Sequence, residues 1–184
     1  MLFKELDDGT GRKPRKLQTD VFKWLSNNWD TSVIGIQAPT GTGKSFISKV
    51  LQNELGGSII VPTNNLMDQY LKDYPTTNFL KGVAKYHCKE NNVSCEEVRT
   101  LKLPPCENCI YKRCRKKSLE KEPTIFNPIS RYHLTRSEKW DDCKVVIVDE
   151  AHKLLDLLKL LTTIEFGFDR YPFPEIKTTE QCIK

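Results

Sequence analysis

Apolar positions in the N-terminal part of the chain alternate between helical spacing and short continuous runs. Helical spacing predicts helices at Lys16–Asn27, at about Gly43–Leu55 and at about Asn64–Asp73. Short apolar runs predict strands at Ser32–Gln37 and Ser58–Val61. Strands that alternate with helices are typical of an α/β fold, in which helices flank both faces of a parallel sheet.

This alternation stops in the middle of the chain and resumes beyond it. Residues 86–123 are rich in Cys, Lys, Arg and Pro and lack long apolar periodicity, so we predict an insertion that a bound cofactor holds together. Strands are predicted again at Thr124–Phe126 and Lys144–Val148, followed by a helix from Glu150 to about Leu161 and a tail of strand and loops. The sequence thus predicts one discontinuous α/β domain, 1–85 and 124–184, interrupted by the insertion 86–123.

Composition places the chain among soluble globular proteins, because 38% of its 184 residues are hydrophobic and 29% are charged. No apolar run approaches the roughly 20 residues that span a bilayer, and the N-terminus lacks a signal-peptide pattern. We therefore expect no membrane partner and a location in the cytoplasm of a cell or infected host, or in the nucleus of a eukaryote. The net charge of +5 favours a polyanionic partner such as nucleic acid.

A glycine-rich loop at Ala38–Ser45 lies between a predicted strand and a predicted helix, which is the setting that a phosphate-binding loop requires. Its glycines let the backbone turn and direct N–H groups inward, and the helix N-terminus adds a positive dipole. Lys44 would reach the β- and γ-phosphates of ATP, and the Ser45 hydroxyl would complete the Mg²⁺ shell. A chance Gly/Thr-rich turn is the alternative. The expected nucleotide contacts are Ala38, Pro39, Thr40, Gly41, Thr42, Gly43, Lys44 and Ser45.

An acidic motif, Asp149-Glu150-Ala151-His152, follows the predicted strand Lys144–Val148. A strand that ends in two carboxylates brings them to the carboxyl edge of the sheet, beside the phosphate loop. Asp149 would hold Mg²⁺ through its water shell, and Glu150 would accept a proton from the attacking water. His152 is expected to hydrogen-bond across the cleft. The alternative is a helix-start pair that only favours the dipole. We predict catalytic roles for Lys44, Asp149, Glu150 and His152.

Five of the seven cysteines lie between Cys88 and Cys114. In a reducing compartment such a group is typical of a metal or iron–sulfur site rather than of disulfides. Four thiolates suit zinc as well as iron, although the chain has one Cys-x-x-Cys pair where zinc ribbons usually have two. A site without metal is the third alternative. Cys143 and Cys182 lie outside the group and are predicted to be ordinary thiols.

Together these motifs resemble the superfamily-two DNA helicases, specifically their XPD/DinG-like iron–sulfur branch, over about Arg15 to Leu161. Arg15-Lys16-Leu17-Gln18 resembles the element that reads adenine ahead of the phosphate loop, which implies an adenine contact by Gln18. Val61–Gln69 (VPTNNLMDQ) resembles the next motif, which implies that Thr63 and the helix beginning at Asn64 touch the phosphates of a nucleic-acid strand.

The resemblance also implies a RecA-like sheet of the P-loop NTPase type and a four-iron four-sulfur (4Fe-4S) cluster in the insertion. The branch places four cysteines between its first two ATP motifs, which implies the ligands Cys88, Cys95, Cys106 and Cys109. Cys114 falls where relatives have an alanine, so it is expected to be a bystander and the first substitute if Cys95 is not a ligand.

A run of basic residues follows Cys109, namely Lys112, Arg113, Arg115, Lys116 and Lys117. The resemblance implies that the cluster domain contacts phosphates where the duplex separates, and contacts of that kind carry no sequence information. A solvated charged face is the alternative.

The resemblance implies an ATP hydrolase and DNA helicase that moves 5′ to 3′ on single-stranded or fork DNA. Such enzymes need a second, C-terminal RecA-like domain with an arginine finger, and nothing after His152 resembles it. We therefore expect the N-terminal motor half, weakly active alone, with the other domain in the full-length chain or in a separate polypeptide. Two rival classes remain: a non-motor P-loop ATPase or nucleotide switch, and a metal-stabilised nucleic-acid-binding module with a degenerate ATP site.

Overall fold

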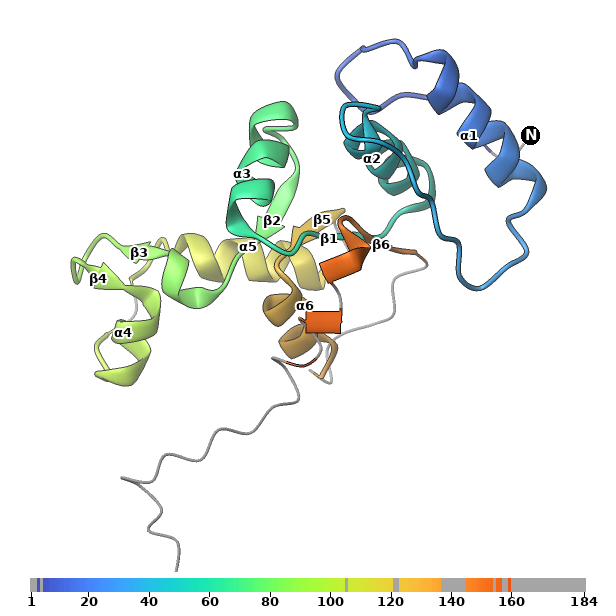
Figure 1. The fold of residues 1–184 in the computed structure, drawn as a ribbon. Helices are drawn as coiled ribbons and strands as arrows, with labels where there is room; N and C mark the ends of the chain where they lie inside the picture. The colour runs from blue at the N-terminus through green and yellow to red at the C-terminus, as the bar shows by residue number, and fades with distance from the viewer. Residues whose placement is uncertain are drawn as a thin grey trace, which may run out of the picture.

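The computed structural model describes residues 3, 5–104, 106–120, 123–136, 145–153, 155–156 and 159. Within this part of the chain, parallel strands form one sheet in the order β2-β5-β1-β6 (Figure 1). The strands are β1 (Ser58–Ile60), β2 (Asn78–Leu80), β5 (Thr124–Phe126) and β6 (Val146–Val148). The parallel sheet predicted from the alternating pattern is thereby confirmed.

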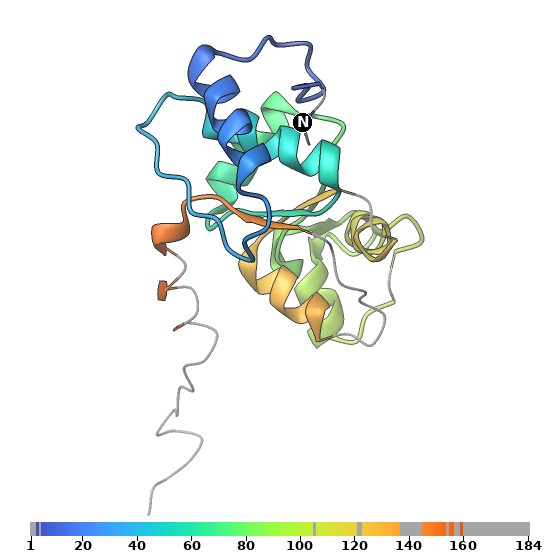
Figure 2. The same cartoon turned by 90° about the vertical axis from the view of Figure 1, so that its right-hand side faces the viewer.

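Helices cover both faces of this sheet (Figure 2). On one face lie α1 (Lys16–Asn27), α2 (Lys44–Leu55) and α3 (Asn64–Asp73), and on the other lie α5 (Ile110–Leu119) and α6 (Pro128–Thr135). Successive side chains of a strand point to opposite faces of the sheet, so each strand contributes residues to both helical layers. Ile59 and Ile125 pack with α3, whereas Phe126 packs with Leu134 of α6.

The three N-terminal helices begin and end where their sequence patterns predict. The Thr63 hydroxyl caps α3 by accepting a hydrogen bond from the Leu66 N–H at 3.2 Å. At the other end of α2, Gly56 adopts a φ of 67° and its N–H bonds back to the Gln52 carbonyl. Local signals of this kind determine helix ends without reference to the rest of the fold.

The strand predicted at Ser32–Gln37 is wrong, because none of these residues is in a strand in the structure. Val33 is 87% exposed, and Ile34 packs against the apolar cluster of α1 and α2 instead of continuing the sheet. Ile34 therefore packs on the helices, and the segment lies across a cavity from β6. Within the described residues, β6 is an edge strand.

The carboxyl ends of the strands meet at one edge of the sheet, and the residues after β5 and β6 are each bonded to a neighbouring strand. The Asp149 N–H donates to the Ile60 carbonyl at 3.0 Å, and the Asn127 N–H donates to the Leu80 carbonyl at 3.2 Å. These bonds extend the ladder past β6 and hold the acidic motif at that edge, which is where parallel α/β sheets place their ligand sites.

The insertion contains more regular structure than its sequence pattern predicted. After a 3-10 turn, η1 (Val83–Lys85), come a hairpin of β3 (His87–Cys88) and β4 (Val93–Ser94), then α4 (Cys95–Thr100), then α5. Buried residues of these elements share one cluster with Leu80, Phe126 and Leu134 of the main domain. The insertion is therefore packed on the sheet domain and not only on itself.

The predicted helix from Glu150 begins as a 3-10 turn, η2 (Ala151–Lys153). Most of its remainder, the predicted tail at 162–184, and Cys143 and Cys182 lie outside the described residues. Among the residues that the structure does describe, no helix is both long and apolar enough to cross a membrane.

Substituting Gly57 with alanine is expected to destabilise the protein by about 3 kcal/mol. Gly57 has a φ of 147°, and a Cβ atom there would lie 2.3 Å from the backbone oxygen of Val145, just before β6. The measurement is the urea midpoint at constant slope. Gly82 is the matched control, because its φ is −57° and no atom lies within 4 Å of an added Cβ. Equal midpoints for both variants would contradict the prediction.

Candidate functional site

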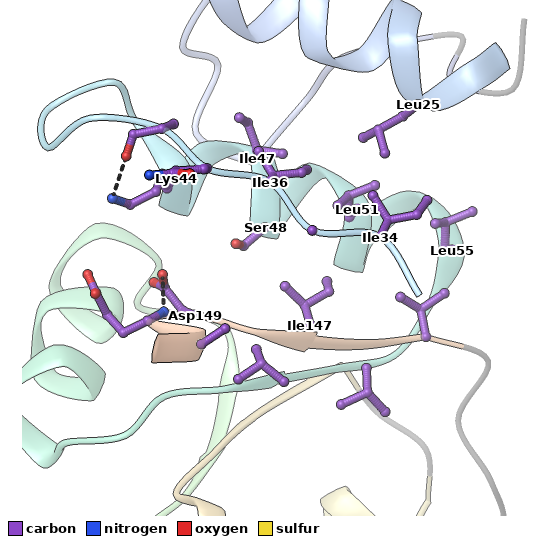
Figure 3. Close-up of a pocket in the computed structure, with 18 of the residues that line it drawn as sticks. Leu25, Ile34, Ile36, Lys44, Ile47, Ser48, Leu51, Leu55, Ile147 and Asp149 are labelled. Atoms are coloured by element: carbon purple, nitrogen blue, oxygen red, sulfur yellow. Dashed lines mark hydrogen bonds between the residues drawn. The ribbon is translucent and has the colours of Figure 1, made fainter. Parts of the chain in front are cut away.

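A cavity of about 910 Å³ separates α2 and residues 32–38 from β6 and the acidic motif. Lys44 and Ser48 of α2 line one side, and Asp149, Glu150 and His152 line the other. Figure 3 shows Lys44 and Asp149 at the same end of this cavity, with Ile34 and Ile147 at the apolar end. The structure thus brings the two halves of the predicted ATP site to one space, although they are distant in the sequence.

The phosphate loop is held by bonds to its own carbonyls and to the residues ahead of it. Gly43 adopts a φ of 82° and precedes α2, so the first turn of the helix faces the loop. The Lys44 ammonium donates to the Ala38 carbonyl at 3.1 Å, and the Thr42 hydroxyl donates to the Pro39 carbonyl at 2.8 Å. Ala38 and Lys44 line the cavity, whereas Ser45 is half-buried in the first turn of α2.

Gln18, the predicted adenine contact, is 3% exposed and lies against the phosphate loop. Its amide nitrogen lies 3.1 Å from the Thr42 carbonyl and 3.3 Å from the Gly43 carbonyl, and its oxygen accepts from the Arg15 N–H at 2.8 Å. In this structure the side chain therefore supports the loop. A contact with adenine stays a prediction.

The Asp149 carboxylate has a donor on each oxygen. Oδ1 accepts from the Glu150 N–H at 2.9 Å, and Oδ2 accepts from the hydroxyl of Tyr70 on α3 at 2.8 Å. Burial, and then the charge of Asp149, raises the pKa of Tyr70 well above its usual value, so the hydroxyl is a donor at neutral pH. Carboxylate oxygens held in this way suit a hard cation such as Mg²⁺.

Glu150 occupies the left-handed region, with a φ of 55°, which is unusual for a residue other than glycine. Such conformations cluster at functional sites. His152 was expected to bond across the cleft, but its Nδ1 lies 3.2 Å from the Glu150 carboxylate in the same turn. Its side chain is 68% exposed, so His152 contacts Glu150 from the solvent side.

A second cavity, of about 820 Å³, lies between the insertion and α6. All four predicted cluster ligands line it: Cys88, Cys95, Cys106 and Cys109. Besides burial, these thiols shift one another's pKa: Cys88 and Cys109 raise that of Cys106, and Cys109 and Cys88 raise that of Cys95. The fold therefore gathers these four sulfurs around one cavity.

The protonation of these thiols depends on their surroundings. Burial, and then the neighbouring thiols, raises the pKa of Cys106 to about 12, and burial raises that of Cys95 to about 11. The pKa of Cys88 is lowered, because the backbone and side-chain N–H groups of Asn91 donate to its sulfur. The Asn91 amide lies 3.3 Å from Cys88 Sγ and also donates to the Pro104 carbonyl at 2.9 Å. Asn91 was not predicted from the sequence.

Cys114 lies apart from this cavity, on the buried face of α5, where its thiol bonds with Tyr86. Among the described residues, no group of three or more His, Cys, Asp or Glu side chains is arranged to hold a metal ion. The donor set still fits an iron–sulfur cluster, because it offers four thiols and N–H donors to sulfur.

The predicted nucleic-acid contacts fall in two places. The four basic residues Lys112, Arg113, Arg115 and Lys116 are all exposed on α5, and Lys112 and Arg115 also line the cysteine cavity. Thr63 and Asn64 lie at the N-terminus of α3, just beyond the carboxyl end of β1. Thr63 is exposed and Asn64 is half-buried.

Comparison with protein-family models gives one finding. Residues 12–167 match the family described as type III restriction enzyme, res subunit, also called ResIII. No curated protein and no solved structure gives a significant match. The matched range covers the phosphate loop, the cysteine insertion and the acidic motif.

Proposed function

The chain belongs to the type III restriction enzyme res subunit family, a helicase-like family of superfamily two, and on this premise we propose that it is the ATP-hydrolysing half of a DNA helicase. One observation carries the proposal: Lys44, Asp149 and Glu150 line one cavity at the carboxyl edge of a parallel sheet. Sites at that edge bind phosphorylated ligands in α/β folds, and P-loop enzymes use these three residue types to hold the phosphates and Mg²⁺ and to orient the attacking water.

Each residue has a separate task in the proposed reaction. Lys44 exchanges its bond to the Ala38 carbonyl for the β- and γ-phosphates of ATP. Asp149 holds Mg²⁺, which when bound neutralises charge on those phosphates. Glu150 accepts a proton from the water whose oxygen attacks the γ-phosphorus, while the bond from that phosphorus to the bridging oxygen of ADP breaks. Asp149 and Glu150 are adjacent, so metal binding and water activation depend on the same turn.

The finer part of the proposal is that the chain resembles the XPD/DinG-like branch and carries a 4Fe-4S cluster on Cys88, Cys95, Cys106 and Cys109. Support comes from the four thiols on one cavity wall and from the basic helix α5, which begins just after Cys109. In this proposal a single strand of DNA passes along α5 and the N-terminus of α3 in the 5′ to 3′ direction. A C-terminal RecA-like domain completes the ATP cleft.

Strand binding is tested by reversing two charges on α5. The double variant Lys112→Glu/Arg115→Glu is expected to bind single-stranded DNA with a log–log salt slope that is smaller in magnitude by about 1.4, because each lost phosphate contact on a single strand removes roughly 0.7. Fluorescence anisotropy of a labelled oligonucleotide at several salt concentrations measures the slope. ATP turnover is expected to rise with the strand in wild type and less in the variant.

The matched control is Lys13→Glu/Lys23→Glu, which changes the net charge equally at two exposed positions in the N-terminal part of the chain. If both double variants had the same salt slope, the basic residues of α5 would be a solvated charged face that does not contact the strand. ATP turnover that ignores DNA would favour the non-motor nucleotide switch. Two results together would favour the metal-stabilised binding module. Lys44→Ala would bind DNA as tightly as wild type, and wild type would not hydrolyse ATP.

A further inference from the structure

Tyr70 is a buried tyrosine that joins three elements of the ATP site. It lies on α3 and is 1% exposed. Its hydroxyl donates to Asp149 Oδ2 at 2.8 Å, and the Ser48 side chain on α2 also acts on this tyrosine. Figure 3 shows Ser48 on the α2 side of the cavity and Asp149 opposite it. Tyr70 therefore ties the carboxylate after β6 to α3, beside the phosphate-loop helix α2.

The bond from Tyr70 sets the orientation of the Asp149 carboxylate. The other donor, the Glu150 N–H, comes from the next residue in the chain, so it moves with Asp149. Tyr70 lies 79 positions earlier in the sequence and is anchored by the packing of α3 on the sheet. Any shift of α3 relative to β6 therefore changes the direction in which the carboxylate points.

The same helix begins at the predicted strand contacts. Thr63 caps α3, and its exposed position lies about two turns, or roughly 10 Å, from Tyr70. Between them, Met67 is fully buried, so the inner face of α3 moves as one packed surface. A phosphate bound at Thr63 and Asn64 and the hydroxyl of Tyr70 thus act on opposite ends of one rigid element.

We propose that Tyr70 is a positioning residue that couples strand binding at the N-terminus of α3 to the Mg²⁺-holding carboxylate of Asp149. This inference rests on the proposed function. When the strand contacts Thr63 and Asn64, it fixes α3, and the Tyr70 hydroxyl then holds Asp149 in the orientation that accepts the cation. Without the strand, the position of α3 and the orientation of the Asp149 carboxylate both vary more widely.

The test is a Mg²⁺ titration of fluorescent ATP-analogue binding, with and without a saturating dT oligonucleotide. In wild type the strand is expected to lower the half-saturating Mg²⁺ concentration about fivefold, a typical coupling between two sites. Tyr70→Phe removes only the hydroxyl, and it is expected to raise that concentration about tenfold and to abolish the effect of the strand. In EDTA, nucleotide binding and the affinity for the oligonucleotide are both expected to stay unchanged.

Tyr74→Phe is the matched control, because Tyr74 is also a buried tyrosine at the end of α3, but its hydroxyl donates to Asp8 at 2.9 Å. It is expected to keep the wild-type response to the strand. If Tyr70→Phe is unstable, Ser48→Ala is the second variant, because Ser48 on α2 acts on the same tyrosine. The effect of the strand in Ser48→Ala is expected to be at least threefold smaller than in Tyr74→Phe.

The outcomes separate this inference from the proposed function. If wild type binds both ligands and Tyr70→Phe or Ser48→Ala keeps the full response to the strand, the coupling role is overturned and the helicase proposal stands. If wild type binds both ligands without any mutual effect, the coupling role is likewise overturned. If wild type binds neither the nucleotide nor the strand, the proposed function fails, and this inference fails with it.

Discussion

Replacing Glu150 with glutamine is expected to lower ATP turnover by a factor of about 10²–10⁴, the usual contribution of a general base. The amide cannot take a proton from the attacking water, whereas Lys44 and Asp149 still bind the phosphates and the cation. Affinity for the Mg²⁺-nucleotide complex is therefore expected to change by less than about threefold. Single-turnover phosphate release measures the rate, and fluorescent nucleotide titration measures the affinity.

Two further variants separate binding from chemistry. Glu54→Gln makes the same chemical change at the far end of the same cavity, where the carboxylate lies on α2, and it is expected to leave turnover unchanged. Lys44→Ala is expected to weaken nucleotide binding itself, because it removes the cation that meets the phosphates. A Glu150→Gln variant with wild-type turnover would show that another group activates the water.

The ATP site was predictable from the sequence because its signals are local. Gly43 and Lys44 mark the loop and the start of α2, and Asp149 and Glu150 follow an apolar run that predicts a strand. That both motifs lie at one edge follows from parallel strands, whose carboxyl ends coincide. Residue identity and element order were therefore enough to bring Lys44 and Glu150 to one cavity.

The environment of Asp149 could not be predicted in the same way. Tyr70 shows only as an apolar position of α3 at helical spacing from Met67, and no pattern in the sequence names its partner. The bond to Asp149 depends on how α3 packs on the sheet, which is a long-range property. The predicted strand at Ser32–Gln37 failed for a related reason, since Ile34 can be buried against α1 and α2 as well as against a sheet.

The insertion was predicted by composition and not by its elements. Its helix α5 buries only Cys114 and Ser118, a thiol and a hydroxyl, so apolar periodicity could not reveal it. The short strand β2 was missed because its three residues are specified by pairing with β5, which lies beyond the whole insertion. Clustered cysteines nevertheless indicated where a separate unit interrupts the domain.

The cysteine cavity leads to the second large expected effect, which is the loss of bound iron on substitution of one ligand. Protein purified without oxygen is expected to be brown and to hold about four irons per chain, the content of one 4Fe-4S cluster. Cys106→Ser is expected to lose most of this iron, because its thiol lies between those of Cys88 and Cys109. Elemental analysis and visible absorbance measure the content.

Cys114→Ser is the control, since Cys114 is a buried cysteine of the insertion that does not line the cavity, whereas Cys106 is half-buried and lines it. It is expected to keep its iron. If instead Cys114→Ser loses iron and Cys95→Ser keeps it, the two residues exchange roles. A colourless protein with about one zinc per chain would replace the cluster by a zinc site, and a protein free of both metals would refute the proposed cofactor.

Iron loss is also expected to loosen the insertion while the sheet domain stays folded. Metal binding stabilises small domains that lack a sufficient core of their own, and residues of α4 and α5 line the cysteine cavity together. Limited proteolysis of Cys106→Ser is therefore expected to cut within the insertion, whereas its nucleotide affinity stays near that of wild type. Cuts at equal rates in Cys106→Ser and Cys114→Ser would mean that the shared cluster with Leu80, Phe126 and Leu134 holds the insertion without metal.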